Sequence, residues 1–163
     1  MRAKHITVLG LGNILNRDEG VGVHAVQAMQ RAWTPRFPAV EFIDGGTMGL
    51  DLLPIVEDAT HLLLLDCVNA AQPPATLIEL DKKQIPLYAQ MKMSIHQITF
   101  HEVLGLAHWR NTMPRHLHLV GIQPQNLELG LELSPQIQAQ LPQLLKNAER
   151  VLKRWTRAQP KEK

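Results

Sequence analysis

Residues 6–22, ITVLGLGNILNRDEGVG, join a short apolar strand to a glycine turn and then to the start of a helix. A glycine turn after a buried strand is typical of a nucleotide-binding loop, but the sixth position of the dinucleotide fingerprint, which needs Gly or Ala, is Leu15. The turn also presents two carboxylates, Asp18 and Glu19, which would repel a phosphate at the helix start. Because carboxylates bind cations, this loop favours a metal or another positive ligand.

Outside this stretch, the chain alternates apolar strands with amphipathic helices. The continuous apolar run at residues 61–65 is typical of a central parallel strand that is covered on both faces. Further strands are predicted at 5–9, 40–43, 76–80 and 116–122, and helices at 21–33, 50–56, 95–107 and 135–155. This order predicts an α/β fold of three layers, α/β/α, with a mostly parallel twisted sheet of about five strands and helices on both faces. We expect residues 1–155 to form a single α/β domain and 156–163 a polar, basic tail.

The composition is that of an ordinary globular domain. The 163 residues are 45% hydrophobic, and the formal net charge is +2. The sequence contains no basic stripe interleaved with aromatic residues, which argues against nucleic acid as a partner. No apolar run is long enough for a signal peptide or a membrane span, so we expect a cytoplasmic protein without a membrane partner, monomeric when free.

Cys67 is the only cysteine, which excludes an intramolecular disulfide and an all-cysteine zinc site. It follows Asp66 in a strand, so the two side chains should point to opposite faces of the sheet. No histidine is positioned by the sequence to activate the thiol. We therefore expect a buried, inert cysteine rather than a nucleophile.

Polar side chains gather where the predicted parallel strands end. Glu19 follows the first strand, Asp44 the second and Asp66 the third, while a loop from Gln123 follows the last and His96 stands at a helix start. Sites in open α/β sheets form at this edge. One Glu, one Asp and one His with an open position can hold Zn²⁺ or Ni²⁺.

Each of these residues also has a purely structural interpretation. Glu19 can complement a helix dipole, Asp66 can cap a turn, and His96 can form hydrogen bonds at a helix start. Adjacent carboxylates on a turn rarely point the same way. We therefore expect Asp18 to support the loop while Glu19 faces the site.

Five motifs, in order, resemble those of the hydrogenase maturation endopeptidases, which process the large subunit of nickel–iron hydrogenases. The resemblance spans residues of about 5 to 135. The motifs are Gly10-Leu11-Gly12-Asn13-Ile14-Leu15 with Asp18-Glu19-Gly20-Val21-Gly22-Val23, Asp44-Gly45-Gly46-Thr47, Asp66 after four leucines, Ser94-Ile95-His96-Gln97, and Leu119-Val120-Gly121-Ile122-Gln123-Pro124.

The resemblance implies an endopeptidase that removes the C-terminal extension of a hydrogenase large-subunit precursor after nickel insertion. It implies that Glu19, Asp66 and His96 coordinate the metal and that Asp44 is a further site residue. Nickel would be recognised on the substrate, without an organic cofactor, and a zinc-like or cadmium ion could occupy the site in isolation. Attack on the peptide bond by a carboxylate-activated water and by a metal-bound water both satisfy the chemistry.

Three other functions remain open from the sequence. A non-catalytic nickel-binding assembly chaperone would use the same three residues and would bind the precursor without cutting it. A nucleotide-binding module is disfavoured by the acidic loop and Leu15. A related germination or spore peptidase on the same scaffold is disfavoured by the pairing of Asp44-Gly45-Gly46-Thr47 with the motif around His96.

Overall fold

The computed structural model describes residues 2–85 and 95–157, of which 95–99 are described by their backbone alone. Five strands form one sheet with the order β2-β1-β3-β5-β4. The strands are β1 (Ile6–Leu11), β2 (Val40–Gly46), β3 (His61–Cys67), β4 (Leu77–Asp81) and β5 (His116–Ile122). The helices are η1 (Arg17–Gly20), α1 (Val21–Trp33), η2 (Gly49–Leu52), α2 (Leu53–Asp58), α4 (Ile95–Trp109) and α5 (Pro135–Thr156).

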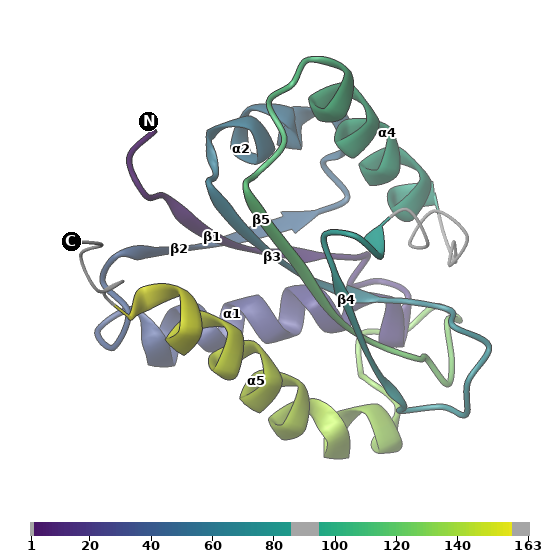
Figure 1. Ribbon diagram of the computed structural model, residues 1–163. Coiled ribbons are helices and arrows are strands. Elements are labelled where there is room, and N and C mark those ends of the chain that lie inside the picture. The colour runs from purple at the N-terminus through teal and green to yellow at the C-terminus, as the bar shows by residue number, and fades with distance from the viewer. Residues whose placement is uncertain (1, 86–94, 158–163) are drawn as a thin grey trace.

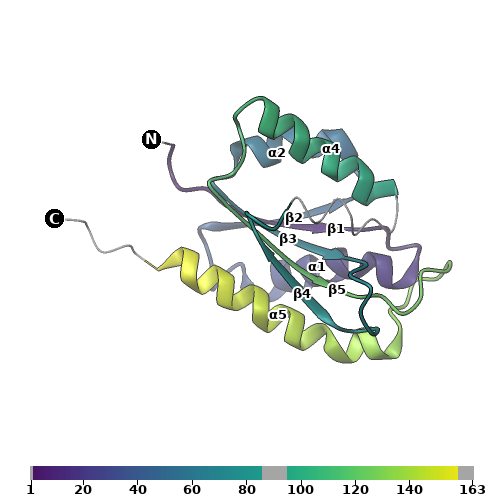
Figure 2. The same cartoon turned by 45° about the vertical axis from the view of Figure 1, so that its right-hand side comes forward.

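Four of the strands run parallel, and the edge strand β4 is antiparallel to β5. Helices α1 and α5 cover one face of the sheet, and α2 and α4 cover the other (Figures 1 and 2). The predicted α/β/α architecture with a mostly parallel sheet of five strands is therefore confirmed.

The leucine run of β3 shows why the sheet is buried on both sides. Leu63 and Leu65 belong to the core beneath α1 and α5, whereas Leu62 and Leu64 belong to the core beneath α2 and α4. All four side chains are fully buried. A strand with alternating side chains needs this continuous apolar sequence only when helices pack against both faces.

The start of α1 lies unusually close to the sheet. A Cβ atom on Gly22 would stand 2.1 Å from the carbonyl oxygen of Leu65 and 2.4 Å from that of Leu11. Only glycine permits this approach, because a side chain at that distance would overlap the strand backbone. The approach places η1, just before α1, against the carboxyl ends of β1 and β3.

The observed elements extend several of the predicted ones. Strand β2 continues through Asp44 to Gly46, and β3 continues through Asp66 to Cys67. The helix predicted at 50–56 divides into η2 and α2, and α5 ends at Thr156. The predicted tail lies mostly outside the described residues. No helix in the described part of the chain combines the length and apolarity that crossing a membrane requires.

Candidate active site

Asp18 is a fully buried carboxylate that holds the loop between β5 and α5. Its Oδ2 accepts hydrogen bonds from the backbone N–H groups of Gln125 (2.9 Å) and Asn126 (2.8 Å) and from the Ser134 hydroxyl (2.8 Å). Its Oδ1 accepts one from the backbone N–H of Ser134 at 2.6 Å. Four bonds to one carboxylate fix η1 relative to this loop, which is the supporting role predicted for Asp18.

Three more hydrogen bonds join the loop before η1 and the start of η1 to the loop between β5 and α5. The N–H of Gly130 donates to the carbonyl oxygen of Leu15, and the N–H of Arg17 donates to that of Gly130, both at 2.9 Å. The side-chain amide of Asn16 donates to the carbonyl oxygen of Leu127 at 3.1 Å. No sequence pattern predicts this junction, because its bonds join irregular segments more than a hundred residues apart.

Glu19 follows directly and is placed by a close backbone contact. A Cβ atom on Gly12 would lie 1.8 Å from the carbonyl oxygen of Glu19, and Gly12 has φ +129°, a conformation that side chains rarely allow. Glycine at position 12 is thus required for η1 to fold back onto the end of β1. The side chain of Glu19 is almost completely buried there, with 6% of the residue exposed.

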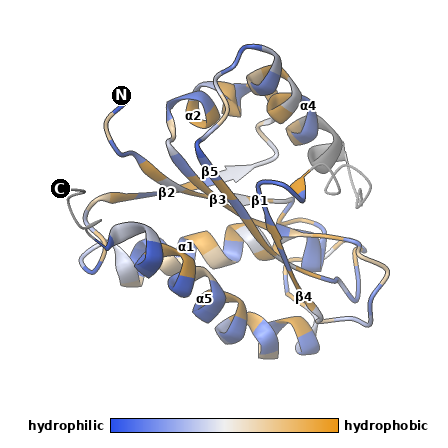
Figure 3. Cartoon of the chain, in the orientation of Figure 1, coloured by the Kyte–Doolittle hydropathy of each residue, from blue (hydrophilic) through white to orange (hydrophobic). Residues whose placement is uncertain are grey.

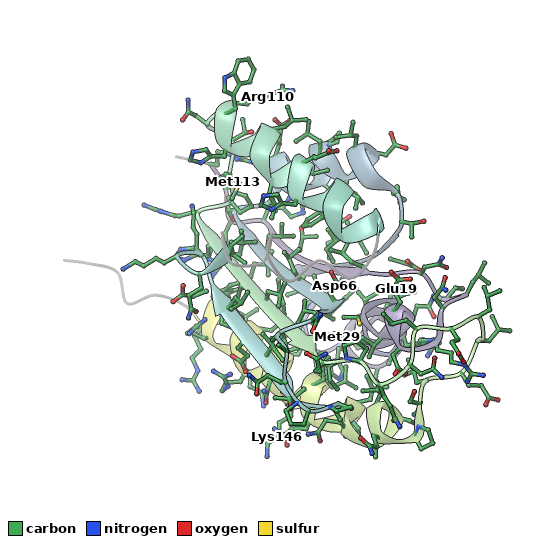
Figure 4. The ribbon with its side chains drawn as sticks, turned by 90° about the vertical axis from the view of Figure 1, so that its right-hand side faces the viewer. Glu19, Met29, Asp66, Arg110, Met113 and Lys146 are labelled. Atoms are coloured by element: carbon green, nitrogen blue, oxygen red, sulfur yellow. The ribbon has the colours of Figure 1, made fainter. Side chains whose placement is uncertain are left out.

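The structure brings Glu19 and Asp66 into one neighbourhood at the end of β3. Asp66 is fully buried, and its Oδ1 accepts a hydrogen bond from the backbone N–H of Cys67 at 2.8 Å. Burial raises the pKa of the Cys67 thiol well above its ordinary value, and the negative charges of Asp66, Glu19 and Asp18 raise it further. The charges of three carboxylates therefore act on one thiol, and Figure 4 shows Asp66 and Glu19 beside each other.

The same surroundings make Cys67 unsuitable as a nucleophile. The residue is fully buried, and its raised pKa leaves it protonated at neutral pH. Because the thiolate is the reactive species, a neutral thiol without access to solvent is inert. This agrees with the inert cysteine predicted from the sequence.

Asp44 lies at the same edge of the sheet but on a different face. In the sheet register, Gly10 pairs with Asp44 on one side and with Leu65 on the other, so Asp44 shares a face with Leu65. Asp66 points to the opposite face by alternation. Asp44 is exposed, and its Oδ2 accepts a hydrogen bond from the side-chain amide of Gln27 in α1 at 2.9 Å. The structure therefore does not join Asp44 to the buried carboxylates.

A pocket of about 160 Å³ lies between the two glycine turns and gives Asp44 a possible site role. Gly12, Asn13 and Ile14 line it from the loop after β1, and Asp44, Gly46 and Thr47 line it from the end of β2, with Val23 from α1. Asp44 is thus at the wall of a pocket beside Glu19's loop rather than in the carboxylate cluster. Its predicted part in the site stays a prediction.

His96 is the second residue of α4, which begins at the carboxyl edge of the sheet (Figure 1). Its side chain lies outside the described residues. Within the described part of the chain, no three His, Cys, Asp or Glu side chains are grouped so that they could hold a metal ion. Glu19 and Asp66 have the right chemistry for two ligands of a divalent metal, and the three-residue site stays a prediction.

Gln123, the remaining polar group predicted at this edge, has a structural role. Its Oε1 accepts hydrogen bonds from the backbone N–H groups of Ala70 (2.8 Å) and Gln72 (3.3 Å). Its Nε2 donates to Oδ1 of Asn69 at 3.2 Å. Gln123 therefore fastens the loop after β3 to the end of β5.

Comparison with known proteins identifies the family. The family model for hydrogenase maturation protease matches residues 23–151. The hydrogenase expression/formation protein HupD of Rhodobacter capsulatus is 38% identical over 157 residues, which cover 94% of this chain and 74% of the relative. HupD of Thiocapsa roseopersicina is 42% identical over 138 residues, covering 83% of this chain, and the match spans only 62% of that relative's length.

Solved structures agree with this result. The hydrogenase maturating endopeptidase HybD from Escherichia coli superimposes with a TM-score of 0.84 at 31% sequence identity, over 93% of this chain and 94% of HybD. A hydrogenase maturation protease HybD from Thermococcus kodakarensis shares the fold at 19% identity, with a TM-score of 0.74 over 91% of this chain and 99% of its own.

The fold and these matches define the class of the chain as a peptidase with a three-layer α/β/α fold. More narrowly, the chain belongs to the hydrogenase maturation protease family.

Proposed function

We propose that this protein removes a C-terminal extension from the large-subunit precursor of a nickel–iron hydrogenase after nickel has been inserted. In this proposal Glu19, Asp66 and His96 recognise the nickel carried by the precursor and so position the scissile bond. The observation that carries the proposal is that two buried carboxylates, Glu19 of η1 and Asp66 of β3, both act on the Cys67 thiol at the end of β3, in a member of this protease family.

The burial of these carboxylates supports a charged ligand. Taking an ionised carboxylate out of water costs several kcal/mol unless charge or hydrogen bonding compensates it. A divalent cation delivered by the substrate would add an opposite charge beside these carboxylates only when it is present. The site would therefore bind a metal-loaded precursor better than an empty one, which makes nickel a checkpoint for cleavage.

The surroundings of the site support a folded protein as substrate. Of the eight large apolar side chains that the described residues expose, six stand on loops or on η2 at the carboxyl edge of the sheet. They are Ile14, Leu15, Met48, Leu50, Leu129 and Leu131. We call these six residues the apolar rim. Exposed apolar groups concentrated around a site are typical of protein–protein contact, so the apolar rim fits the surface of a precursor protein.

Two routes to peptide-bond hydrolysis are compatible with these residues. A carboxylate of the site can act as general base and take a proton from the attacking water. Alternatively, the cation on the substrate can lower the pKa of a bound water. Either route needs the Glu19 and Asp66 carboxylates in place, whereas the Cys67 thiol takes part in neither.

The proposal places the enzyme in the cytoplasm as a monomer. The chain has one cysteine, which is buried, and this is compatible with a reducing compartment, where structural disulfides are rare. Size-exclusion chromatography with light scattering tests the monomer directly, and a dimer mass would contradict this part of the proposal.

Intact mass spectrometry of the precursor tests the activity. Nickel-loaded and nickel-free precursor are each incubated with the wild type and with Glu19→Gln, Asp66→Asn and His96→Ala. The matched control is Asp51→Asn, which removes an exposed carboxylate from η2 near the same edge. We expect loss of one C-terminal peptide only from the nickel-loaded precursor, with the wild type and the control.

Two results would contradict the proposal. Equal cleavage of nickel-free precursor would remove the metal checkpoint, and normal cleavage by two of the three site variants would remove the metal-recognition assignment. A stable complex without any change in precursor mass would instead support an assembly chaperone. Far-ultraviolet circular dichroism of each variant separates a lost site from a lost fold.

A further inference from the structure

The outer side of α5 and the turn after β4 form a strongly basic surface. Four cations recur along α5 at positions 146, 150, 153 and 154, and a fifth, Arg157, is the residue that caps its C-terminus. Lys82 and Lys83 follow the end of β4. We call these seven residues the basic face. Figure 3 shows hydrophilic residues recurring along α5 on the side turned away from the sheet.

The basic face is hollowed rather than flat. One hollow of about 640 Å³ runs along α5, and a second of about 270 Å³ lies between α5, the turn after β4 and the start of β5. Arg154 lines both, so the two hollows adjoin. All seven cations line one or both hollows, whereas the acidic lining residues are only Asp81 and Glu149. The excess there is larger than the net charge of +2 for the whole chain.

Part of this charge is not neutralised by neighbouring acids. Arg150 pairs with Glu79 at 2.6 Å, and Lys153 pairs with Glu149 at 3.2 Å. For Lys146, Arg154 and Arg157, by contrast, no acidic partner lies within ion-pair distance among the residues that the structure describes.

The titration of nearby histidines is consistent with a positive field at this surface. Burial lowers the pKa of His116, and the charges of Arg115, Lys82 and Arg154 lower it further. Burial likewise lowers the pKa of His118, against the opposing effect of Glu79, and Arg154 and Arg150 lower it further. Cations just after β4, just before β5 and on α5 therefore act on the same small region.

The residues that line the two hollows indicate which kind of negatively charged partner fits the basic face. Nucleic-acid surfaces usually add exposed aromatic side chains for stacking, but the one aromatic residue in the lining, Trp155, is buried. Membrane-binding helices place exposed apolar groups beside their cations, and the α5 residues that line the larger hollow are all polar or charged. An acidic protein segment needs neither feature.

We propose that the basic face is a docking surface for an acidic segment of the protein substrate, distinct from the site that cuts it. This inference rests on the proposed function in naming the substrate as the partner. From Lys146 in α5 to its C-cap Arg157, the cations extend over eleven residue steps, or about 17 Å. An extended acidic stretch of about five residues covers that length.

Such a docking surface orients the substrate before the site engages it. The basic face and the buried carboxylates lie on different parts of the molecule, with Lys146 well away from Glu19 and Asp66 in Figure 4. An acidic segment held on α5 would therefore steer association without competing for the metal-recognising residues. Its loss should weaken substrate binding and leave the chemical step unchanged.

Steady-state processing kinetics on the nickel-loaded precursor test the proposal with two variants. Lys146→Gln and Arg154→Gln each remove one exposed charge and keep a good helix former. The control is Arg110→Gln, an exposed cation just after α4 that pairs with Glu57 at 3.0 Å and lies at the opposite end of the molecule (Figure 4). We expect each α5 variant to raise KM about fivefold with kcat unchanged, and to weaken the salt dependence of kcat/KM.

A binding experiment separates this proposal from the proposed function. Chemical-shift titration of the wild type with a hexaglutamate peptide should move the amide signals of α5 and the turn after β4. A duplex DNA oligonucleotide and phosphatidylserine vesicles are tested in parallel. If the wild type fails to cut the precursor, the proposed function fails, and the peptide titration still decides whether the basic face takes an acidic segment.

The following results would overturn the docking proposal. One is a KM for both α5 variants within about 1.5-fold of that of Arg110→Gln. Another is the absence of any shift on α5 with hexaglutamate. Tighter binding of DNA or of the vesicles than of the peptide would assign the basic face to a nucleic acid or a membrane instead.

Discussion

Replacing Asp18 by Asn tests whether one buried carboxylate holds the loop beside the site. The wild-type side chain accepts four hydrogen bonds, three at Oδ2 and one at Oδ1. Asn has nearly the same shape but only one acceptor oxygen. If the amide oxygen takes the Oδ2 position, the amide NH₂ group faces the buried N–H of Ser134. If the amide oxygen takes the Oδ1 position, the NH₂ group faces the N–H groups of Gln125 and Asn126.

The expected loss follows from these contacts. At least one hydrogen bond is replaced by two opposed donors, which costs about 1–3 kcal/mol. The three remaining bonds lose their charge assistance, and the relief of burying a neutral group offsets part of that loss. We therefore expect Asp18→Asn to lower the free energy of unfolding by about 2–4 kcal/mol.

Urea unfolding followed by circular dichroism measures this difference. Glu128→Gln is the matched control, because Glu128 is an exposed carboxylate in the same loop, and its change should stay within about 0.5 kcal/mol. A shift of less than about 0.5 kcal/mol for Asp18→Asn would refute the reasoning, since the four bonds would then contribute nothing beyond those of an amide.

Three further predictions concern Gly12, His61 and Cys67. Gly12→Ala would bring a methyl group onto the Glu19 carbonyl oxygen, so we expect a loss of about 3 kcal/mol or more in urea unfolding together with loss of processing; a fully active, stable variant would disprove the contact. Burial, aided by the charge of His116, lowers the pKa of His61 to about 4, against 6.5 as the ordinary value. Below pH 6.5 the unfolded chain therefore binds more protons than the folded chain, so the free energy of unfolding is highest above pH 6.5 and falls toward pH 4. His61→Gln should remove about 1 kcal/mol of that fall, a value reduced because the ring is partly exposed. His108→Gln is the control. Cys67→Ala should keep the processing rate within about twofold while unfolding about 1–2 kcal/mol more easily, and a variant without activity would show that the thiol takes part.

Much of the fold could be predicted because it depends on local patterns. The leucine run of residues 62–65 identified a central strand, and α1 was predicted with its observed bounds, Val21–Trp33, from its apolar spacing and the following Pro35. The direction of β4 could not be read from its sequence, because a strand's own residues do not record which way its neighbour runs.

The site was predictable only in part. Glu19 and Asp66 were predicted to lie close together because both follow strands that end at one edge of a parallel sheet, which depends on topology alone, and their role in the site stays a prediction. The separation of Asp44 from Asp66 was missed, although strand alternation and register together contain it: one residue of offset at the strand end moves a side chain to the other face. The junction at Gly130 depends on backbone contacts between distant loops, which no local pattern encodes.

The loop that Asp18 holds has a consequence for how specificity can change. Its backbone is anchored at residues 125, 126, 130 and 134, yet the side chains of Leu129 and Leu131 are 79% and 65% exposed. We expect substitutions at these two positions to leave the loop's hydrogen bonds and the buried carboxylates in place. The loop thus combines a hydrogen-bonded backbone with two exposed side chains at its tip. A library of substitutions at 129 and 131 is therefore a direct route to proteases with altered choice of protein substrate.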